Sequence, residues 1–359
     1  MTAPIRVMIV DDSLVTRRLV EDSLREVPGI EVVGTAANGR VAVAKVVELR
    51  PDVITLDVEM PELDGLATLR LLKKSHSQIR VIMFSSLTGS GASATIEALA
   101  EGAADYVQKP AGAGGMTATR ERIRAELVPK IRALCEHRAQ PPVALPTLAT
   151  PLPARALRVV AIGVSTGGPA ALHELLSALP RALAVPVLIV QHMPAAFIGL
   201  LAKRLASACP LPVAEATAGT MLAPGRVWIA PGDRHLAIAR RGTELVLDLQ
   251  QGPPECSCRP AVDVLFRSVA AQFGSSALGV VLTGMGQDGL RGSKAIRAAG
   301  GTIYVQDAAS SVVWGMPGAV ARAGLADRIV SLADMSCAIA TAVAGPGTSA
   351  VPERHRART

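Results

Sequence analysis

The chain has 359 residues, of which 50% are hydrophobic and only 2% aromatic, so it is long enough for two domains with aliphatic cores. No apolar run reaches the roughly 18 residues that a membrane span needs, no signal peptide is expected, and the odd number of five cysteines argues against a disulfide framework. A cytoplasmic protein that is not embedded in a membrane is therefore expected. The net charge of +7 indicates a solubilising surface rather than a nucleic-acid site, because no Lys/Arg stripe with interleaved aromatic residues is visible.

Apolar runs alternate with helical patterns through the first part of the chain. The helical pattern at 13–26 has Ser13 as a possible N-cap, and a later one covers 119–135. Strands are expected at 5–10, 30–35, 52–56, 80–84 and 104–107. This alternation predicts a parallel sheet covered by helices on both faces, with functional sites at the carboxyl ends of its strands.

Polar residues follow several of these strands. Asp11 and Asp12 follow the first strand and Asp57 the third, while Ser85 closes the fourth and Lys109 follows the fifth. Each acid alone is better explained as a helix cap or a solvated loop. Together, however, carboxylates at one sheet edge repel each other unless a cation joins them, and oxygen ligands suit Mg²⁺. The combination predicts a carboxylate that accepts a phosphoryl group.

This part of the chain resembles the receiver domain of bacterial response regulators. The resemblance rests on Val10-Asp11-Asp12-Ser13, Leu56-Asp57-Val58-Glu59-Met60-Pro61, Asp64-Gly65, Phe84-Ser85-Ser86 and Lys109-Pro110. It implies a flavodoxin-like fold with phosphorylation at Asp57. It also implies Mg²⁺ held by Asp11, Asp12, Asp57 and the backbone carbonyl of Glu59, and phosphoryl sensing by Ser85, Lys109 and the aromatic switch residue Tyr106.

A proline-rich stretch without periodicity separates two domains. Residues 1–136 are expected to form the receiver domain, 137–156 a Pro-rich linker, 157–346 a catalytic domain and 347–359 a basic tail.

Strand and helix patterns alternate again in the second domain. Strands are expected at 158–163, 185–190, 278–282 and 302–306, and helices at 170–178, 196–207, 261–273 and 290–299. Between 213 and 249, short apolar runs are separated by Pro-Gly and Arg-Gly turns, which indicates an antiparallel patch. The predicted fold class is α/β, with two doubly wound parallel-sheet domains. The second is Rossmann-like and carries an antiparallel β insertion.

Three residues with hydrolase chemistry lie at strand ends of this second domain. Ser165 lies in Gly163-Val164-Ser165-Thr166-Gly167, which fits the G-x-S-x-G pattern of an exposed nucleophile. His192 and Asp288 follow two other strands, so they could act as general base and as the acid that orients it. Asp263 remains an alternative acid, and Asp288 could be only a turn residue. The order Ser, His, Asp differs from that of the α/β-hydrolases.

The second domain resembles the chemotaxis protein-glutamate methylesterase (CheB) family. The resemblance rests on Ile162-Gly163-Val164-Ser165-Thr166-Gly167-Gly168-Pro169, Gln191-His192-Met193-Pro194, Ala230-Pro231-Gly232-Asp233, Arg259-Pro260-Ala261-Val262-Asp263-Val264-Leu265-Phe266 and Leu282-Thr283-Gly284-Met285-Gly286-Gln287-Asp288-Gly289. It implies the catalytic triad Ser165, His192 and Asp288, with Met285 acting at the oxyanion through its backbone amide and Thr166 beside the nucleophile.

The same resemblance implies the reaction and the partners. The expected reactions are demethylation of glutamate methyl esters on chemoreceptors, with methanol released, and deamidation of particular receptor glutamines. A CheA-type histidine kinase would donate the phosphoryl group, Mg²⁺ would serve the receiver site alone, and the receiver would cover the active site until phosphorylated. No nucleic-acid partner is expected.

Two alternatives remain open from the sequence. The chain could be a response regulator that works as a phosphorylation-dependent binding or DNA-binding module without catalysis, although DNA binding would need a helix-turn-helix output domain. Cys256 and Cys258 could be metal ligands, but they lack a second ligand pair nearby and are interpreted as loop thiols.

Overall fold

The computed structural model describes residues 3–86, 89–110, 115–136 and 156–345. All of the predicted linker except its last residue, and the whole predicted tail, lie outside these ranges, so their predicted boundaries stay predictions. Within the same ranges, the structure contains no helix with the length and apolar character needed to cross a bilayer.

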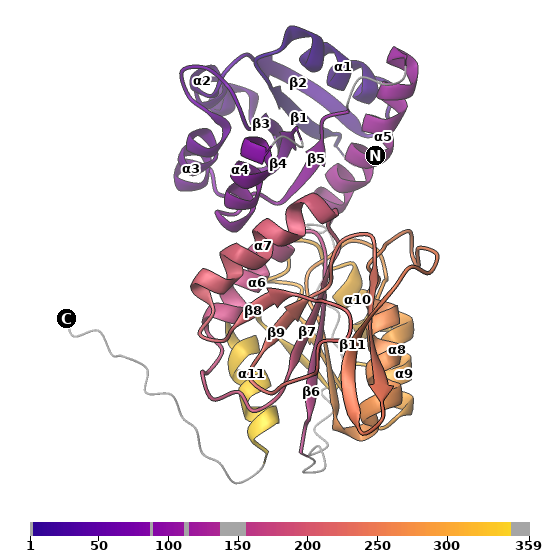
Figure 1. The fold of residues 1–359 in the computed structure, drawn as a ribbon. Coiled ribbons are helices and arrows are strands. Elements are labelled where there is room, and N and C mark those ends of the chain that lie inside the picture. The colour runs from indigo at the N-terminus through magenta and orange to yellow at the C-terminus, as the bar shows by residue number, and fades with distance from the viewer. Residues whose placement is uncertain (1–2, 87–88, 111–114, 137–155, 346–359) are drawn as a thin grey trace, which may run out of the picture.

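The first domain is a five-stranded parallel sheet in the order β2-β1-β3-β4-β5, as expected for a flavodoxin-like fold. Helices α1 and α5 pack together, whereas α2, α3 and α4 form a second group (Figure 1). The strands are β1 (Ile5–Val10), β2 (Ile30–Ala36), β3 (Val53–Asp57), β4 (Arg80–Ser85) and β5 (Asp105–Gln108). The helices are α1 (Leu14–Leu24), α2 (Gly39–Leu49), α3 (Gly65–Ser75), α4 (Gly89–Ala100) and α5 (Met116–Glu136). Ser13 caps α1 as predicted.

The second domain is built on a seven-stranded parallel sheet in the order β14-β13-β12-β6-β7-β9-β8, with a separate antiparallel pair β10-β11. The predicted fold class is confirmed. The strands are β6 (Val159–Val164), β7 (Val187–Gln191), β8 (Val213–Glu215), β9 (Val227–Ile229), β10 (His235–Arg241), β11 (Glu244–Gln250), β12 (Ala277–Val281), β13 (Thr302–Gln306) and β14 (Arg328–Val330). The helices are α6 (Gly168–Ser177), α7 (Ala195–Ala208), α8 (Val262–Phe273), the 3₁₀ helix η2 (Gly274–Ser276), α9 (Leu290–Ala298), α10 (Met316–Arg322) and α11 (Leu332–Ala344).

The predicted antiparallel patch between 213 and 249 is only half right. β10 and β11 form an antiparallel hairpin, but β8 and β9 are parallel strands of the main sheet. The connection between them runs beside β11, where the amide of Gly219 donates to the carbonyl of Leu247. The Pro-Gly turn then carries the chain back to the main sheet rather than between two paired strands, a path that local turn signals do not reveal.

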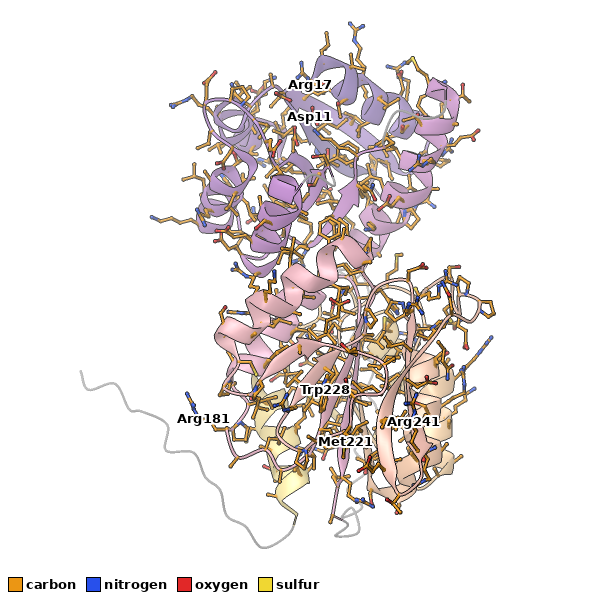
Figure 2. All side chains as sticks on the ribbon, in the orientation of Figure 1. Asp11, Arg17, Arg181, Met221, Trp228 and Arg241 are labelled. Carbon is orange, nitrogen blue, oxygen red and sulfur yellow. The ribbon has the colours of Figure 1, made fainter. Side chains whose placement is uncertain are left out.

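The side chains fill the interior of both domains (Figure 2). Trp228 of β9 is 4% exposed and lies inside the second domain, while Met221 is 53% exposed. Arg181 and Arg241 are also exposed and lie at the margins of this domain. Buried apolar side chains, most of them aliphatic, also pack around the main sheet of the second domain, as the composition predicts.

The two domains meet where α4 and β5 of the first approach α6 and α7 of the second (Figure 1). The ring of Tyr106 in β5 lies 4.8 Å from the ring of Phe197 in α7, measured between centroids. Both rings are buried, at 7% and 1% exposure. The apolar core is therefore continuous across the junction, and the contact includes the turn that carries Ser165.

Candidate active site and phosphorylation site

Ser165 lies in a tight turn between β6 and α6. Its amide donates to the carbonyl of Thr283 at 3.0 Å, which ties the turn to the loop after β12. Gly167 has a φ of 78°, and a Cβ at this position would lie 2.7 Å from the side chain of Val312. Only glycine satisfies both conditions. The glycine of the sequence pattern is therefore required by this turn, which leaves the serine half-buried at the end of the sheet.

His192 and Asp288 lie against each other at the neighbouring strand ends. The imidazole Nε2 is 2.8 Å from Oδ2 of Asp288, which is 1% exposed. The same carboxylate accepts hydrogen bonds from the backbone amides of Val262 (2.7 Å), Asp263 (2.9 Å) and Gly289 (2.8 Å). A carboxylate held in this way fixes the ring orientation and keeps the proton on Nε2, which leaves Nδ1 as the basic nitrogen.

The charges of this pair stabilise each other. Burial lowers the pKa of His192, but the hydrogen bond that its ring donates to Asp288 and the neighbouring Cys258 outweigh it and raise the value to about 9. Burial raises the pKa of Asp288, but its hydrogen bond to His192 outweighs this and holds the pKa below the usual range. The pair therefore favours an imidazolium next to a carboxylate, the charge state that a general base reaches after it has taken a proton.

Ser165 lies against the loop after β12 through its amide and Cβ, but its hydroxyl is not hydrogen-bonded to His192 in the part of the chain that the structure describes. A Cβ on Gly284 would lie 2.8 Å from the Cβ of Ser165, so the two loops are in close contact. The neighbouring Met285 is 38% exposed. Within the described ranges, the amides of Met285 and Thr166 donate no hydrogen bond, so both are available to an oxyanion.

Asp263, the alternative acid, does not contact His192. Its Oδ1 accepts from the amides of Gly289 (3.0 Å) and Gly292 (2.6 Å), and its own amide donates to Asp288. Asp263 therefore supports the loop that carries Asp288 instead of replacing it.

Two neighbours of the site were not predicted from the sequence. The thiol of Cys258 lies beside the imidazole of His192. Asp105, at the start of β5 in the first domain, accepts a hydrogen bond of 2.6 Å from the hydroxyl of Thr166. The position of Cys258 one residue before the Arg259-Pro260 motif is a weak signal, whereas no local pattern identifies Asp105.

The receiver acids gather at the carboxyl edge of the first sheet. Carboxylate oxygens of Asp11, Asp12 and Asp57 lie within 4.8 Å of one another. The ammonium of Lys109 is 2.8 Å from Asp11 Oδ2 and 2.7 Å from Asp57 Oδ2. This donor set contains only carboxylate oxygens, with Asp12 exposed to water, so its chemistry fits Mg²⁺.

The electrostatics of this edge centre on Asp57. Burial raises the pKa of Asp57 to about 6 against the opposing hydrogen bond from Lys109. Burial lowers the pKa of Lys109, but its bonds to Asp11 and Asp57 outweigh this and raise the value above the ordinary one. The ammonium therefore stays charged and offsets the repulsion between the acids.

The remaining predicted receiver residues lie around this cluster. The amide of Glu59 donates to Asp57 Oδ1 at 3.4 Å. The Ser85 hydroxyl is bonded to the carbonyls of Ser86 (3.0 Å) and Gly91 (3.2 Å), not to Asp57. Tyr106 faces Phe197 at the domain junction, where burial raises the pKa of its phenol well above the ordinary value.

Comparison with known proteins supports this division of the chain. The family described as CheB methylesterase matches residues 160–339, and the response regulator receiver domain matches residues 7–120. A protein-glutamate methylesterase/protein-glutamine glutaminase of Trichodesmium erythraeum is 50% identical over 336 residues, covering 91% of this chain and 96% of the relative. One from a Nocardioides species is 48% identical over 360 residues, covering 97% and 98%.

A solved structure agrees with the sequence relatives. The Thermotoga maritima CheB methylesterase catalytic domain is 36% identical with a TM-score of 0.51, covering 52% of this chain and 98% of its own. The chain therefore belongs to the CheB methylesterase family, with a receiver domain ahead of the methylesterase domain.

Proposed function

We propose that this chain is a phosphorylation-regulated protein-glutamate methylesterase and protein-glutamine glutaminase of chemosensory adaptation. Its substrates are glutamate methyl esters and particular glutamines of methyl-accepting chemoreceptors. The observation that carries the proposal is the His192–Asp288 pair at 2.8 Å, at the sheet edge that also holds Ser165. The names of the relatives, which match over nearly the whole chain, support the same activity.

The proposed reaction is acyl transfer through a seryl intermediate. The Ser165 oxygen attacks the ester carbonyl carbon while Nδ1 of His192 takes the hydroxyl proton, and Asp288 stabilises the resulting imidazolium. The amides of Met285 and Thr166 would donate to the oxyanion. The bond to the methoxy group then breaks, and the imidazolium returns its proton so that methanol leaves.

A water molecule completes the cycle. His192 takes a proton from this water, the hydroxide attacks the seryl ester, and the serine oxygen recovers the proton as glutamate is released. With a glutamine substrate the same steps release ammonia in place of methanol. No metal or organic cofactor is required for these steps.

The receiver domain would control access to this site. Asp57 would accept a phosphoryl group from a CheA-type histidine kinase, with Mg²⁺ held by Asp11, Asp12, Asp57 and the Glu59 carbonyl. The ion would offset the negative charge of the phosphoryl group and the acids. Lys109 and Ser85 would bind the phosphoryl oxygens, and Tyr106 would transmit the change to α7 through Phe197. A cytoplasmic location suits this partner.

The alternative of a binding or DNA-binding module without catalysis is not favoured. The residues after the receiver form a seven-stranded sheet and match the methylesterase family, not a helix-turn-helix domain. Methanol release from methylated receptor membranes by the full-length protein tests the proposal. Release that requires Ser165 supports it, and an absence of release from phosphorylated protein contradicts it.

A further inference from the structure

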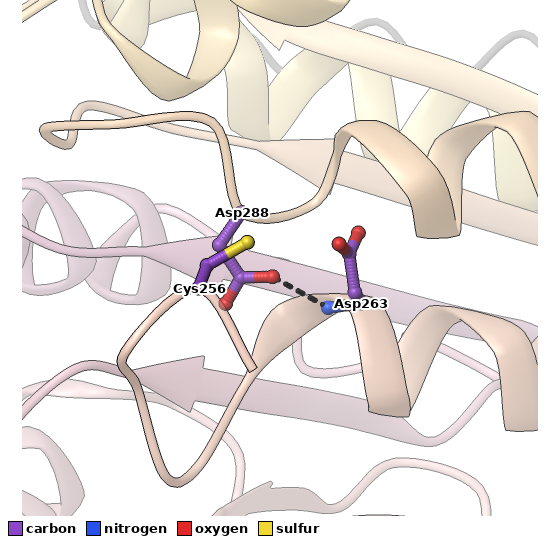
Figure 3. Close-up of side chains that lie close together, drawn as sticks. All are labelled: Cys256, Asp263 and Asp288. Carbon is purple, nitrogen blue, oxygen red and sulfur yellow. Dashed lines mark hydrogen bonds between the residues drawn. The ribbon is translucent and has the colours of Figure 1, made fainter. Parts of the chain in front are cut away.

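The loop between β11 and α8 brings a thiol next to two buried acids. The Sγ of Cys256 and one carboxylate oxygen each from Asp263 and Asp288 all lie within 4.8 Å of one another (Figure 3). Asp263 and Asp288 are each 1% exposed, whereas Cys256 is exposed to solvent. The sequence gives no second ligand pair beside the cysteines, but the fold supplies two carboxylates from separate segments.

One carboxylate oxygen of Asp263 accepts no hydrogen bond from the described residues. Asp263 Oδ1 accepts two backbone hydrogen bonds, from Gly289 and Gly292, but the buried Oδ2 has no hydrogen-bond partner among the described residues. An acceptor that is buried without a partner destabilises the folded protein. This oxygen is therefore available to a ligand that reaches the Asp263 carboxylate.

The charges of the cluster also favour a cation. Burial raises the pKa of Asp263, and the nearby negative charge of Asp288 adds to this effect against the backbone bond from Gly292. Arg267, whose charge lowers the pKa of Asp263, is already paired with Glu255. A bound cation would relieve the repulsion between the two carboxylates.

We propose that Cys256, Asp263 and Asp288 form a site for a divalent metal ion of the zinc type, and that its occupancy inhibits the esterase. A thiolate with two carboxylates suits Zn²⁺ or Co²⁺ better than Mg²⁺, which prefers oxygen alone. With Zn–S of about 2.3 Å and Zn–O of about 2.1 Å, the ligand atoms of a tetrahedral site lie roughly 3.4–3.6 Å apart. The three ligand atoms would therefore have to move closer by about 1 Å from the upper limit of their present separation. Binding displaces the thiol proton of Cys256 to solvent, and water fills the fourth position.

Inhibition follows from the second role of Asp288. The carboxylate that would bind the ion also holds His192, with Oδ2 2.8 Å from Nε2. A divalent positive charge on this carboxylate disfavours the imidazolium that must form when Ser165 is deprotonated. This consequence rests on the proposed esterase function, whereas the binding of the ion does not.

The test uses the full-length protein with Mg²⁺ in excess, so that the receiver acids are occupied. Co²⁺ is titrated while thiolate-to-cobalt charge-transfer absorbance is recorded, and Zn²⁺ is titrated while methanol release is measured. The variants are Cys256→Ser and Asp263→Asn, with Cys337→Ser as the control because Cys337 is also exposed but lies in α11. Since the proposed reaction assigns no step to Cys256, and serine keeps the size of the side chain, Cys256→Ser should keep the metal-free rate.

Wild type and Cys337→Ser should show the absorbance band when Co²⁺ is added. In both proteins Zn²⁺ should lower the rate of methanol release at least tenfold, and a chelator should restore that rate. Cys256→Ser should lose both responses, and Asp263→Asn should bind at least tenfold more weakly. A band that is absent from wild type, or unchanged in Cys256→Ser, would overturn the site. A band that depends on Cys256 without any loss of methanol release would overturn the inhibition. If metal-free protein releases no methanol at all, the proposed function fails, and the absorbance still decides the site.

Discussion

Thr166, the residue after the predicted nucleophile, donates a hydrogen bond of 2.6 Å from its hydroxyl to Asp105 of the receiver domain. The next amide, that of Gly167, donates to the carbonyl of Ala104 at 3.1 Å. Lys130 of α5 holds the other oxygen of Asp105 at 3.1 Å. The start of β5 is thus bonded directly to the turn that carries Ser165, so these hydrogen bonds restrain the turn.

We expect Asp105→Ala to raise the methanol release of the unphosphorylated protein. The substitution removes a hydrogen bond to a charged group, worth about 1.5–3 kcal/mol, so the open form should gain roughly tenfold or more. Phosphorylation should then add less than it adds to wild type. Glu48→Ala, an exposed acid in α2, is the matched control. An unchanged basal rate in Asp105→Ala would show that this contact does not hold the domains closed.

The order of elements could be predicted closely from the sequence because the strands are apolar and β-branched and the turns carry Gly, Asp or Pro. β1 and β13 have the predicted bounds, and most other predicted elements differ by one to three residues at their ends. α10, β14 and α11 were not predicted; α10 and β14 have only 7 and 3 residues, and α10 begins with a Met-Pro-Gly segment. Short elements at the end of a sheet depend on tertiary packing more than on their own pattern.

Asp57 should take up phosphate from a histidine-kinase phosphodonor only when Mg²⁺ is present. Three carboxylates and one ammonium leave this edge with excess negative charge, and an incoming phosphoryl group adds more. Asp57→Asn should remove the label, and it should also keep methanol release at the basal level. Labelling by radioactive phosphodonor, with and without a chelator, checks this. Label retained in Asp57→Asn would assign the phosphorylation to another residue.

Substitutions of the three predicted triad residues should lower the turnover rate by different amounts. Ser165→Ala and His192→Ala should each lower the methanol-release rate by up to about 10⁶, because each removes a group that takes part in bond making. Asp288→Asn should cost about 10⁴, because an amide no longer favours the required tautomer. Asp263→Asn, measured without added metal, should cost far less than Asp288→Asn. Equal losses in the two aspartate variants would mean that the acid has been misassigned.

The arrangement of the candidate site could be predicted where strand ends of one sheet converge, but not where distant parts of the chain meet. Ser165, His192 and Asp288 each follow a strand of one parallel sheet, so their proximity follows from topology. The pairing of Thr166 with Asp105 joins residues 61 positions apart in different domains, and nothing in either local sequence indicates it. Similarly, the free oxygen of Asp263 depends on which backbone amides surround it, and only the folded chain shows this.

The pH dependence of the esterase should follow His192. A general base must be neutral before it takes the serine proton, and the folded pKa of His192 is about 9. We therefore expect kcat/KM for methanol release to rise with pH, to reach half its maximum near pH 9 and to level off above it. The contribution of His192 to folding stability changes with pH in the opposite direction. Because the pKa of His192 in the folded protein exceeds its unfolded value of about 6.5, this contribution is complete below pH 6.5 and is lost as the pH rises through about 9.

A substitution of Cys258 provides a second test of this pH dependence. Cys258 is one of the causes that raise the pKa of His192, after the hydrogen bond that the imidazole donates to Asp288. Cys258→Ala should therefore move the rising limb of the pH profile to lower pH, and Cys337→Ala, at an exposed position in α11, should leave the limb in place. Profiles of kcat/KM measured for all three proteins at one ionic strength make the comparison. If the limb of wild type lies near 6.5 and does not respond to Cys258, then neither Asp288 nor the thiol sets the basicity of His192 in solution.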